Sequence, residues 1–348
     1  MSIVSDKESD NIDSKKQIHN PSIGAPHLVI LGAGASRAAC PNGDKNGKKL
    51  PLMSELGEVL DINSILKNYG LSFDGGNFEE FYSKLTIEHI NQEIISNIEH
   101  AVYEYFSSLE LPDEPTVYDY LVLSLRAKDV IATFNWDPLL SQALLRNQKF
   151  PLPYVWFLHG NVSIGICQEH RVMGPVGANC LHCGRVFIPS KLLYPIKDKD
   201  YSNDIFIRAQ WRHLEKALEK AFIFTIFGYS APTTDTAALD FMKKVWKKTG
   251  ERDWKKTGER EMEEIEIINI ENRDRLYASW EPFIVRSHYR IYDKYFDSIM
   301  SNWPRRSCEK IWDQFAMLKL TDKNPQPKGV DLKTLQEWHL PLVETESE

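Results

Sequence analysis

The sequence has no apolar run long enough to cross a bilayer, and its N-terminal segment is polar rather than signal-like. Cysteine is also scarce, with five residues in a chain of 348. So small and odd a number does not build the disulfide framework of a secreted domain. We therefore expect a soluble, cytoplasmic protein.

The chain also has no excess of basic over acidic residues. The 42 Lys and Arg residues are outnumbered by 49 Asp and Glu residues, which gives a formal net charge of −7. A duplex nucleic acid requires a concentrated basic face, so direct nucleic-acid binding is not predicted, although a local basic patch is compatible with this balance. The apolar fraction of 42% and the charged fraction of 26% are typical of a globular chain.

The chain does contain short, β-rich apolar runs that alternate with helical stretches. Each run ends where small or polar residues begin, and the runs lie at residues 27–34, 129–134, 154–160, 222–228 and 265–270. Apolar residues recur at roughly helical spacing in 77–109 and 118–126. This alternation predicts an α/β fold, with a parallel sheet covered by helices on both faces. In such sheets ligands bind at the carboxyl ends of the strands.

The first run ends in Gly-Ala-Gly-Ala-Ser, at residues 32–36. Closely spaced glycines after a strand allow a sharp turn and present N–H groups at the start of a helix, which suits a pyrophosphate. The third glycine of the dinucleotide fingerprint is absent, because Arg37 stands in its place. An ordinary strand-to-helix turn explains this motif equally well.

A second motif, Thr-Phe-Asn-Trp-Asp-Pro at 133–138, places two polar residues at the end of an apolar run. Asn135 and Asp137 are two positions apart, so both side chains point to the same face of an extended chain. They must find partners there, because unpaired buried polar groups are costly. Asn135 could cap a turn and Asp137 the helix that starts at Pro138, or both could face a ligand.

His159 ends another apolar run, directly before Gly160. A lone histidine in that place is structural by default. Three polar features at three strand ends nevertheless favour one shared site over coincidence.

Three of the five cysteines lie close together, in a pattern typical of a metal site. Cys167 and His170 are three positions apart, and Cys180 and Cys183 follow at the same separation. Two cysteine-rich pairs at this spacing predict a tetrahedral, structural zinc site, with unbound thiols as the alternative. His182 is a less favoured substitute ligand, because it lies inside the second pair.

The order of these motifs resembles the sirtuin family and its sirtuin-like relatives. Gly-x-Ser at 228–230 and the strand with its following polar residues at 267–271 match later family motifs, so the resemblance covers roughly residues 27–272. It implies a large Rossmann-like domain, a small helical and zinc-knuckle module, and NAD as the ligand.

The resemblance also implies a role for each motif. Asn135 would hold the nicotinamide-side ribose and position the attacking water, Asp137 would bind near the nicotinamide, and His159 would be the general base. The remaining predicted NAD contacts run from the diphosphate to the adenosine: Gly32, Ala33, Gly34, Ala35, Ser36, Gly228, Tyr229, Ser230, Asn269 and Glu271.

Two family motifs are missing, and both bear on the reaction. The Phe-Arg of the loop after the phosphate turn is absent from residues 50–56, and residues 188–200 lack the Phe-Gly-Glu segment with which deacetylating sirtuins pair a substrate peptide. The sequence looks closer to the sirtuin-like NAD hydrolases of bacterial anti-phage systems. We therefore expect hydrolysis of NAD to ADP-ribose and nicotinamide in antiviral defence. The alternatives are an NAD-dependent protein deacylase or ADP-ribosyltransferase, and a non-catalytic module that senses NAD or ADP-ribose.

The resemblance further implies control by assembly, because an enzyme that destroys NAD has to be held inactive in a healthy cell. We expect a homo-oligomer or a regulatory partner such as a ring-forming ATPase. The expected organisation is a flexible segment at 1–25, a catalytic domain at 26–300 with a zinc-knuckle insertion at about 160–195, and a helical extension at 301–348 that ends in a frayed acidic tail. The sequence Trp-Lys-Lys-Thr-Gly-Glu-Arg occurs twice, at 246–252 and 254–260, and we interpret it as a lengthened surface loop or helix end.

Overall fold

The computed structural model describes most of the chain. The described residues are 23–88, 91–194, 201, 203–231, 235–254, 264–284, 288–315 and 317–346, with backbone alone for 247–254. Most of the predicted flexible segment at 1–25 lies outside these residues.

The fold is built on one sheet of six parallel strands, ordered β3-β2-β1-β7-β8-β9. Counted along the chain, this order is 3-2-1-4-5-6, the order of the Rossmann fold. The fold class predicted from the sequence is confirmed. The strands are β1 (His27–Leu31), β2 (Val130–Thr133), β3 (Tyr154–Phe157), β7 (Ile223–Phe227), β8 (Glu264–Ile268) and β9 (His288–Tyr292).

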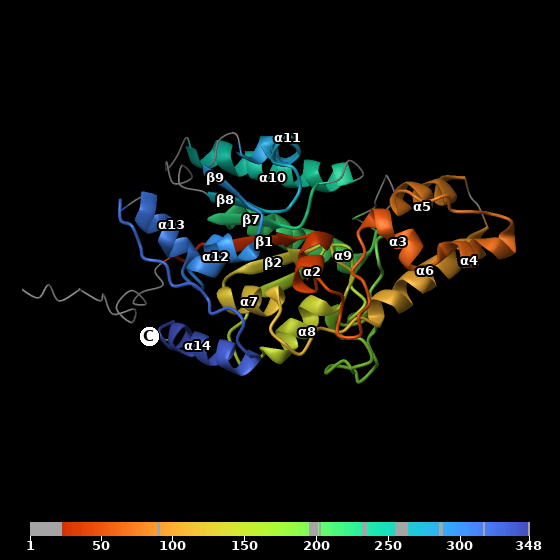
Figure 1. Cartoon of the computed structure of the whole chain (residues 1–348), viewed down its shortest axis with the longest axis horizontal. Coiled ribbons are helices and arrows are strands. Elements are labelled where there is room, and N and C mark those ends of the chain that lie inside the picture. The colour runs from red at the N-terminus through yellow and green to blue at the C-terminus, as the bar shows by residue number, and fades with distance from the viewer. Residues whose placement is uncertain are drawn as a thin grey trace, which may run out of the picture.

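Helices cover both faces of this sheet, which is why β1, β7 and β8 are buried at every position. Along β1, Val29 and Leu31 pack into one core cluster and Leu28 and Ile30 into another. Figure 1 shows α10 and α11 above the sheet and α7 and α8 below it. The helices that flank the sheet are α2 (Ala33–Ala39), α7 (Val117–Ser124), α8 (Leu139–Arg146), α9 (Ile205–Lys220), α10 (Thr236–Trp254) and α11 (Arg273–Ile284).

A helical module follows α2 and lies at the right of Figure 1. Its elements are α3 (Met53–Val59), α4 (Ile62–Leu66), η1 (Lys67–Tyr69), α5 (Phe78–Ile87) and α6 (Gln92–Ser107). Asn77 and Asn91 cap α5 and α6 by accepting N–H bonds from Glu79 and Glu93. The apolar faces of both helices join the core cluster of β1, so this stretch is core rather than a free contact surface.

A second, small antiparallel sheet occupies the predicted zinc-knuckle insertion. It consists of β4 (Ile164–Cys167), β5 (Val172–Pro175) and β6 (Ile188–Pro189), in the order β5-β4-β6.

The C-terminal region is helical, as predicted. Its first elements pack against the large sheet. It comprises η4 (Tyr295–Asp297), α12 (Ile299–Asn302), α13 (Ser307–Phe315) and α14 (Leu332–Glu344). The predicted boundary at 300/301 falls inside α12, and the domain division stays a prediction.

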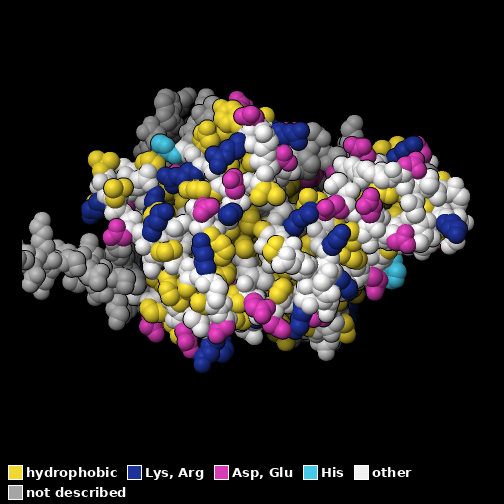
Figure 2. Space-filling view, in the orientation of Figure 1, with side chains coloured by type: hydrophobic (Ala, Val, Ile, Leu, Met, Phe, Trp, Pro, Cys, Tyr) yellow, Lys and Arg dark blue, Asp and Glu magenta, His cyan; other side chains and the backbone are white. Residues whose placement is uncertain are grey.

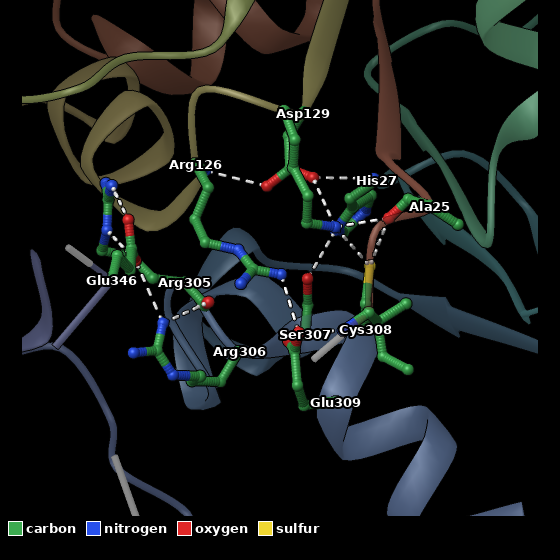
Figure 3. Close-up of polar contacts among 12 residues, drawn as sticks. Ala25, His27, Arg126, Asp129, Arg305, Arg306, Ser307, Cys308, Glu309 and Glu346 are labelled. Carbon is green, nitrogen blue, oxygen red and sulfur yellow. Dashed lines mark hydrogen bonds and ion pairs between the residues drawn. The ribbon is translucent and has the colours of Figure 1, made fainter. Parts of the chain in front are cut away.

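The prediction of a frayed acidic tail is wrong for the described residues. The Glu346 carboxylate accepts two bonds at 2.7 Å from Arg305, which is buried, and forms an ion pair of 3.0 Å with Arg306 (Figure 3). Arg126, in the loop after α7, pairs with Glu309 of α13 at 2.8 Å. Buried charges require such partners, and these pairs fasten the end of the chain onto the loop between α7 and β2.

The first copy of the repeated segment, residues 246–252, lies at the end of α10, in line with the prediction of a helix end. The second copy falls almost entirely outside the described residues. Within the described part of the chain, no helix combines the length and apolarity that a membrane span requires.

Candidate active site and metal centre

The candidate active site lies where the strand order of the large sheet reverses, between β1 and β7. Ligands of doubly wound folds bind at this point, outside the carboxyl ends of the strands. The turns that follow the two strands are in direct contact. The Gly32 N–H donates to Phe227 O at 3.0 Å, and the Gly34 N–H donates to Gly228 O at 2.9 Å.

These turns require glycine because their two backbones lie too close together for a Cβ atom. A Cβ on Gly32 would lie 2.6 Å from Gly228 O, and Gly228, at φ +64°, would place a Cβ 2.1 Å from Ala35 N. The N–H groups of Gly32, Gly34 and Ala35 all donate to backbone carbonyls. These three N–H groups already have acceptors, so a diphosphate bound at this edge would be bound by other groups.

Ser36 is the centre of a buried hydrogen-bonded cluster, which we call the Ser36 cluster: Ser36, Tyr118, Asn135 and Asp137. The Ser36 hydroxyl donates to Asp137 Oδ2 at 2.6 Å and lies 2.7 Å from the Tyr118 hydroxyl. The Asn135 amide donates to Ser36 Oγ and Gly32 O, both at 2.9 Å, and to the Tyr118 hydroxyl at 3.2 Å. Two predicted site residues are thus brought together with the phosphate turn.

Burial controls the protonation of this cluster. It raises the pKa of Asp137, against the hydrogen bonds from Ser36 and from the Leu139 N–H. Burial and the nearby Asp137 raise the pKa of Tyr118 well above its ordinary value. The single hydrogen of the Ser36 hydroxyl is donated to Asp137, so the Tyr118 hydroxyl must be the donor to Ser36. The hydrogen bonds thus run from Tyr118 through Ser36 to the Asp137 carboxylate. Burial likewise raises the pKa of Cys40 to about 12, so this thiol near the turn stays protonated.

Asp137 also has part of the structural role that the sequence left open. Its Oδ1 accepts the Leu139 N–H at 3.2 Å, at the first residue of α8. The helix begins at Leu139, with Pro138 as its N-cap residue, one position later than predicted. One carboxyl oxygen therefore serves the helix, and the other receives the Ser36 hydroxyl.

His159 lies in the turn after β3, and its described ring contacts are with aromatic side chains. Its buried imidazole packs edge-on against Phe134, with ring centroids 4.7 Å apart, and lies parallel to Tyr201 at 6.0 Å. Phe134 in turn stacks on Tyr229, with centroids 4.5 Å apart. Side chains with aromatic rings from the ends of β2, β3 and β7 are thus in contact, through one edge-on pair and one stacked pair.

Asn135 lies in the loop after β2, and its side-chain contacts and those of His159 are on opposite sides of that loop. Phe134, which contacts the imidazole, belongs to the core cluster of α9–α11, whereas Tyr118, which contacts Asn135, belongs to the cluster of α7. Asn161 joins the two sides, because its amide donates to Asp137 O at 2.7 Å and to Asn135 O at 3.3 Å.

The sequence interpretation missed Tyr118 and Asn161. Tyr118 lies in an apolar helical stretch and gave no signal. Asn161 directly follows the His-Gly pair, and a polar residue at that place was a usable signal. Gly160, at φ +78°, would place a Cβ 2.1 Å from Lys191 O, so this turn also requires glycine.

The predicted adenosine-side residues lie further along the same edge and make local contacts. Tyr229 donates its hydroxyl to Asp235 at 3.0 Å, and Ser230 is exposed. Asn269 Oδ1 accepts the Glu271 N–H at 3.1 Å, and Glu271 lies 3.5 Å from Arg275. Their assignment to NAD stays a prediction.

The candidate metal centre lies in the small sheet. Cys167, His170, Cys180 and Cys183 present donor atoms that all lie within 4.8 Å of one another. The Cys167 Sγ is 3.6 Å from both His170 Nδ1 and Cys183 Sγ, and Cys180 Sγ is 3.8 Å from His170 Nδ1. A tetrahedral zinc ion holds sulfur and nitrogen donors roughly 3.5–3.8 Å apart, so the predicted set fits the ion. His182 stacks on the His170 ring at 5.0 Å and is not part of the donor set.

No protein-family profile matches the chain, and no curated protein matches it. Among solved structures, an NAD complex of a Sir2 homologue is similar, with 14% identity, a TM-score of 0.41, and coverage of 88% of this chain and 95% of that chain. An ADP-ribose complex of a Sir2 homologue variant gives 14% identity, a TM-score of 0.41, and coverage of 88% and 98%. Sir2Tm bound to a propionylated peptide gives 14% identity, a TM-score of 0.34, and coverage of 84% and 94%. The Rossmann fold is assigned from the strand order of the large sheet.

Proposed function

We propose that this chain hydrolyses NAD⁺ to ADP-ribose and nicotinamide. The observation that carries the proposal is the Ser36 cluster at the carboxyl ends of β1 and β2, next to the strand-order reversal of a Rossmann sheet, where dinucleotides bind. The polar groups converge there from the ends of β1 and β2, and His159 comes from the end of β3.

The reaction makes modest demands on the protein. Water adds to C1′ of the nicotinamide ribose, the C–N bond breaks, and nicotinamide leaves as a neutral molecule with the bonding electrons. One proton of the water is released. The protein has to orient the ribose, accept that proton and exclude competing solvent.

The side chains of the site suit these tasks. In the proposal, neutral His159 accepts the proton from the attacking water. Asn135 orients the ribose through its amide, and Asp137 holds that amide in place through Ser36. Because Asp137 already receives the Ser36 hydroxyl and the Leu139 N–H, we assign it a positioning role and not that of the base.

The segment after the zinc knuckle supports hydrolysis over transfer to a peptide. β6 pairs with β4, Leu193 N–H donates to His159 O at 2.9 Å, and Lys191 O packs under Gly160. Residues 188–194 are therefore folded onto the knuckle and the His159 turn, and they lack the Phe-Gly-Glu motif with which deacetylating sirtuins pair a substrate peptide. The deacylase or ADP-ribosyltransferase and the NAD-sensing module are the alternatives.

One assay separates these functions. Purified protein is incubated with NAD, alone and with an acetylated peptide, while nicotinamide and ADP-ribose are quantified by chromatography. Hydrolysis predicts ADP-ribose in equal amount to nicotinamide, with or without peptide. Acetyl transfer matched to NAD loss identifies a deacylase, and saturable NAD binding without nicotinamide release identifies a sensor.

We further infer that the metal site holds structural zinc, because three thiolates and one imidazole complete a closed tetrahedron with no position left for substrate. Elemental analysis of purified protein should give about one zinc per chain. Replacing Cys180 and Cys183 with serine should abolish zinc content. Full zinc retention in that variant contradicts the assignment.

A role in anti-phage defence and control by self-association or a ring-forming ATPase are part of the same proposal. Expression in phage-infected bacteria should lower cellular NAD, and His159→Ala should prevent the loss. The oligomeric state that is active is identified by gel filtration followed by the nicotinamide assay on each fraction.

A further inference from the structure

A second concave site lies beside the outer strand β9, beneath the C-terminal segment. Its cavity has a volume of about 490 Å³ and is lined by residues of β9, η4, α12, α13 and the loop that follows α13. Figure 2 shows Lys and Arg side chains around α12 and α13 on this face of the molecule. Although the whole chain is acidic, four cations line this one cavity: Arg290, Lys310, Lys323 and Lys328.

Two of these cations are fixed in the wall of the cavity. Lys310 is only 8% exposed, and its ammonium donates to Gln314 Oε1. Arg290 Nη2 donates to the same oxygen at 3.4 Å, so a single amide oxygen serves both positive groups. Like charges held this close repel each other unless an anion lies between them.

Aromatic rings hold the lysines in place. Lys310 Nζ and Lys323 Nζ lie 5.1 Å and 5.8 Å from the centre of the Trp303 ring, and Lys328 Nζ lies 4.7 Å from that of Phe296. The ring faces attract cations and so gather the three ammonium groups around the cavity. The rings also give the cavity apolar surface.

The surrounding carboxylates do not balance the four cations. Asp297 lines the cavity, and Glu264 lies 3.2 Å from Arg290. Burial raises the pKa of Glu264, and it raises the pKa of Glu266, behind it, to about 7, so Glu266 carries less than full charge near neutrality. Burial and Arg290 lower the pKa of Lys310 to about 8, in keeping with an uncompensated positive field.

We propose that this cavity is a binding site for the diphosphate group of a small molecule. Four cations outnumber the three nearby carboxylates, of which Glu264 and Glu266 are buried, so the cavity has an excess of positive charge that suits a diphosphate better than a single carboxylate. The volume exceeds that of one phosphate and lies within the range of small-molecule sites. Inorganic pyrophosphate and a nucleoside diphosphate share this chemistry, and the rings would add contacts for the base of the latter.

The site is independent of the proposed NAD cleavage. β9 is three strand positions from β1, which at the usual strand spacing is roughly 15 Å. None of the four cations belongs to the Ser36 cluster or the zinc centre.

Lys323 and Lys328 provide the test, because both are exposed and neither is needed to balance a buried acid. Arg290 is unsuitable for the test, since its removal would leave the buried Glu264 carboxylate without this ion-pair partner. The full chain is titrated calorimetrically with inorganic pyrophosphate and with ADP. Lys323→Ala/Lys328→Ala should weaken binding of both about tenfold or more, and binding to the wild type should fall as salt rises.

Lys67→Ala/Lys149→Ala is the matched control, because it removes two exposed lysines elsewhere and gives the same net charge. Its affinities should equal those of the wild type. Tighter binding of ADP than of pyrophosphate identifies a nucleotide as the ligand, and equal binding identifies the inorganic anion. The proposal is overturned if the wild type binds neither, if both variants bind equally well, or if an RNA oligonucleotide binds where the two small anions do not. Nicotinamide release from the same samples reports on NAD cleavage separately.

Discussion

Two buried polar clusters lie on the large sheet, and they contain similar residue types. The Ser36 cluster occupies the carboxyl ends of β1 and β2. The second, which we call the His27 cluster, lies beneath α12 and α13: His27, Thr225, Glu266 and Ser307. His27 Nδ1 lies 2.9 Å from Ser307 Oγ, Nε2 lies 2.7 Å from Thr225 Oγ1, and Thr225 donates to Glu266 at 3.0 Å.

A histidine with a serine and a carboxylate could be taken for a catalytic set, but the surroundings exclude this. His27 is completely buried, at the start of β1, and Figure 3 shows it enclosed by Asp129, Ser307 and the chain around Ala25. Burial lowers the pKa of His27 to about 4, so the ring is neutral and satisfied. The position of a cluster relative to the strand ends, and not its residue types, therefore separates a candidate active site from a structural network.

The largest expected effect concerns the pH dependence of stability that His27 confers. An unfolded histidine has its ordinary pKa of 6.5, against about 4 in the folded protein, so the unfolded state binds more protons between these values. The contribution of His27 is present above pH 6.5 and is lost as pH falls toward 4, by about 3 kcal/mol. Glu266 acts in the opposite direction, because its pKa is raised, so the difference between wild type and His27→Gln is the quantity to measure.

Urea denaturation at pH 7.5 and pH 5 gives this difference. The wild type should lose more of its free energy of unfolding than His27→Gln over the same interval. A protonated His27 at pH 5, seen in the NMR shifts of its imidazole, would contradict the assignment of a structural, neutral ring.

An effect of similar size is expected where the C-terminal tail packs beside the His27 cluster. Glu346→Ala removes the carboxylate shared by Arg305 and Arg306 and leaves two buried guanidinium groups short of a partner. The free energy of unfolding should fall by about 3 kcal/mol. Glu344→Ala, at an exposed position of the same tail, should change it by less than about 0.5 kcal/mol. Equal values for the two variants would show that the tail is not fastened as described.

The smallest effect compares one serine from each cluster. Ser36→Ala removes the hydroxyl that links Asn135 to Asp137, and nicotinamide release should fall about tenfold. Ser307→Ala removes a buried hydroxyl of the same type, and release should stay within about twofold of the wild type. Steady-state rates, measured beside thermal melting of each variant, separate loss of activity from loss of fold. A larger loss of nicotinamide release in Ser307→Ala than in Ser36→Ala would contradict the comparison of the two clusters.

The parts of the fold that the sequence predicted are those with a strong local signal. β1, β7 and β8 are buried on both faces, so their apolar runs are continuous. β9 was missed because it lies at the sheet edge and is half exposed, with the polar sequence His-Tyr-Arg-Ile-Tyr. The donor set of the candidate metal centre was predictable, since four donors at short, regular separations fold locally.

The candidate site was predictable only in part, for the same reason. Asn135, Asp137 and His159 each follow an apolar run, whereas Tyr118 reaches the cluster from a buried helix with no sequence mark of its own. The His27 cluster joins residues 27, 225, 266 and 307, and no single segment contains the pattern. The cations around the second cavity are likewise dispersed from 290 to 328, within a chain whose net charge suggested no such patch.

The most direct test of the proposed function is nicotinamide release from NAD by the purified wild type, Asn135→Ala and His159→Ala, with His27→Gln as the structural-histidine control. Release by the wild type and by His27→Gln, with at least a ~100-fold loss in both site variants that still melt as folded proteins, is the result we predict. Undiminished release by folded His159→Ala, or none from any form of the wild type at any oligomeric state, would contradict it.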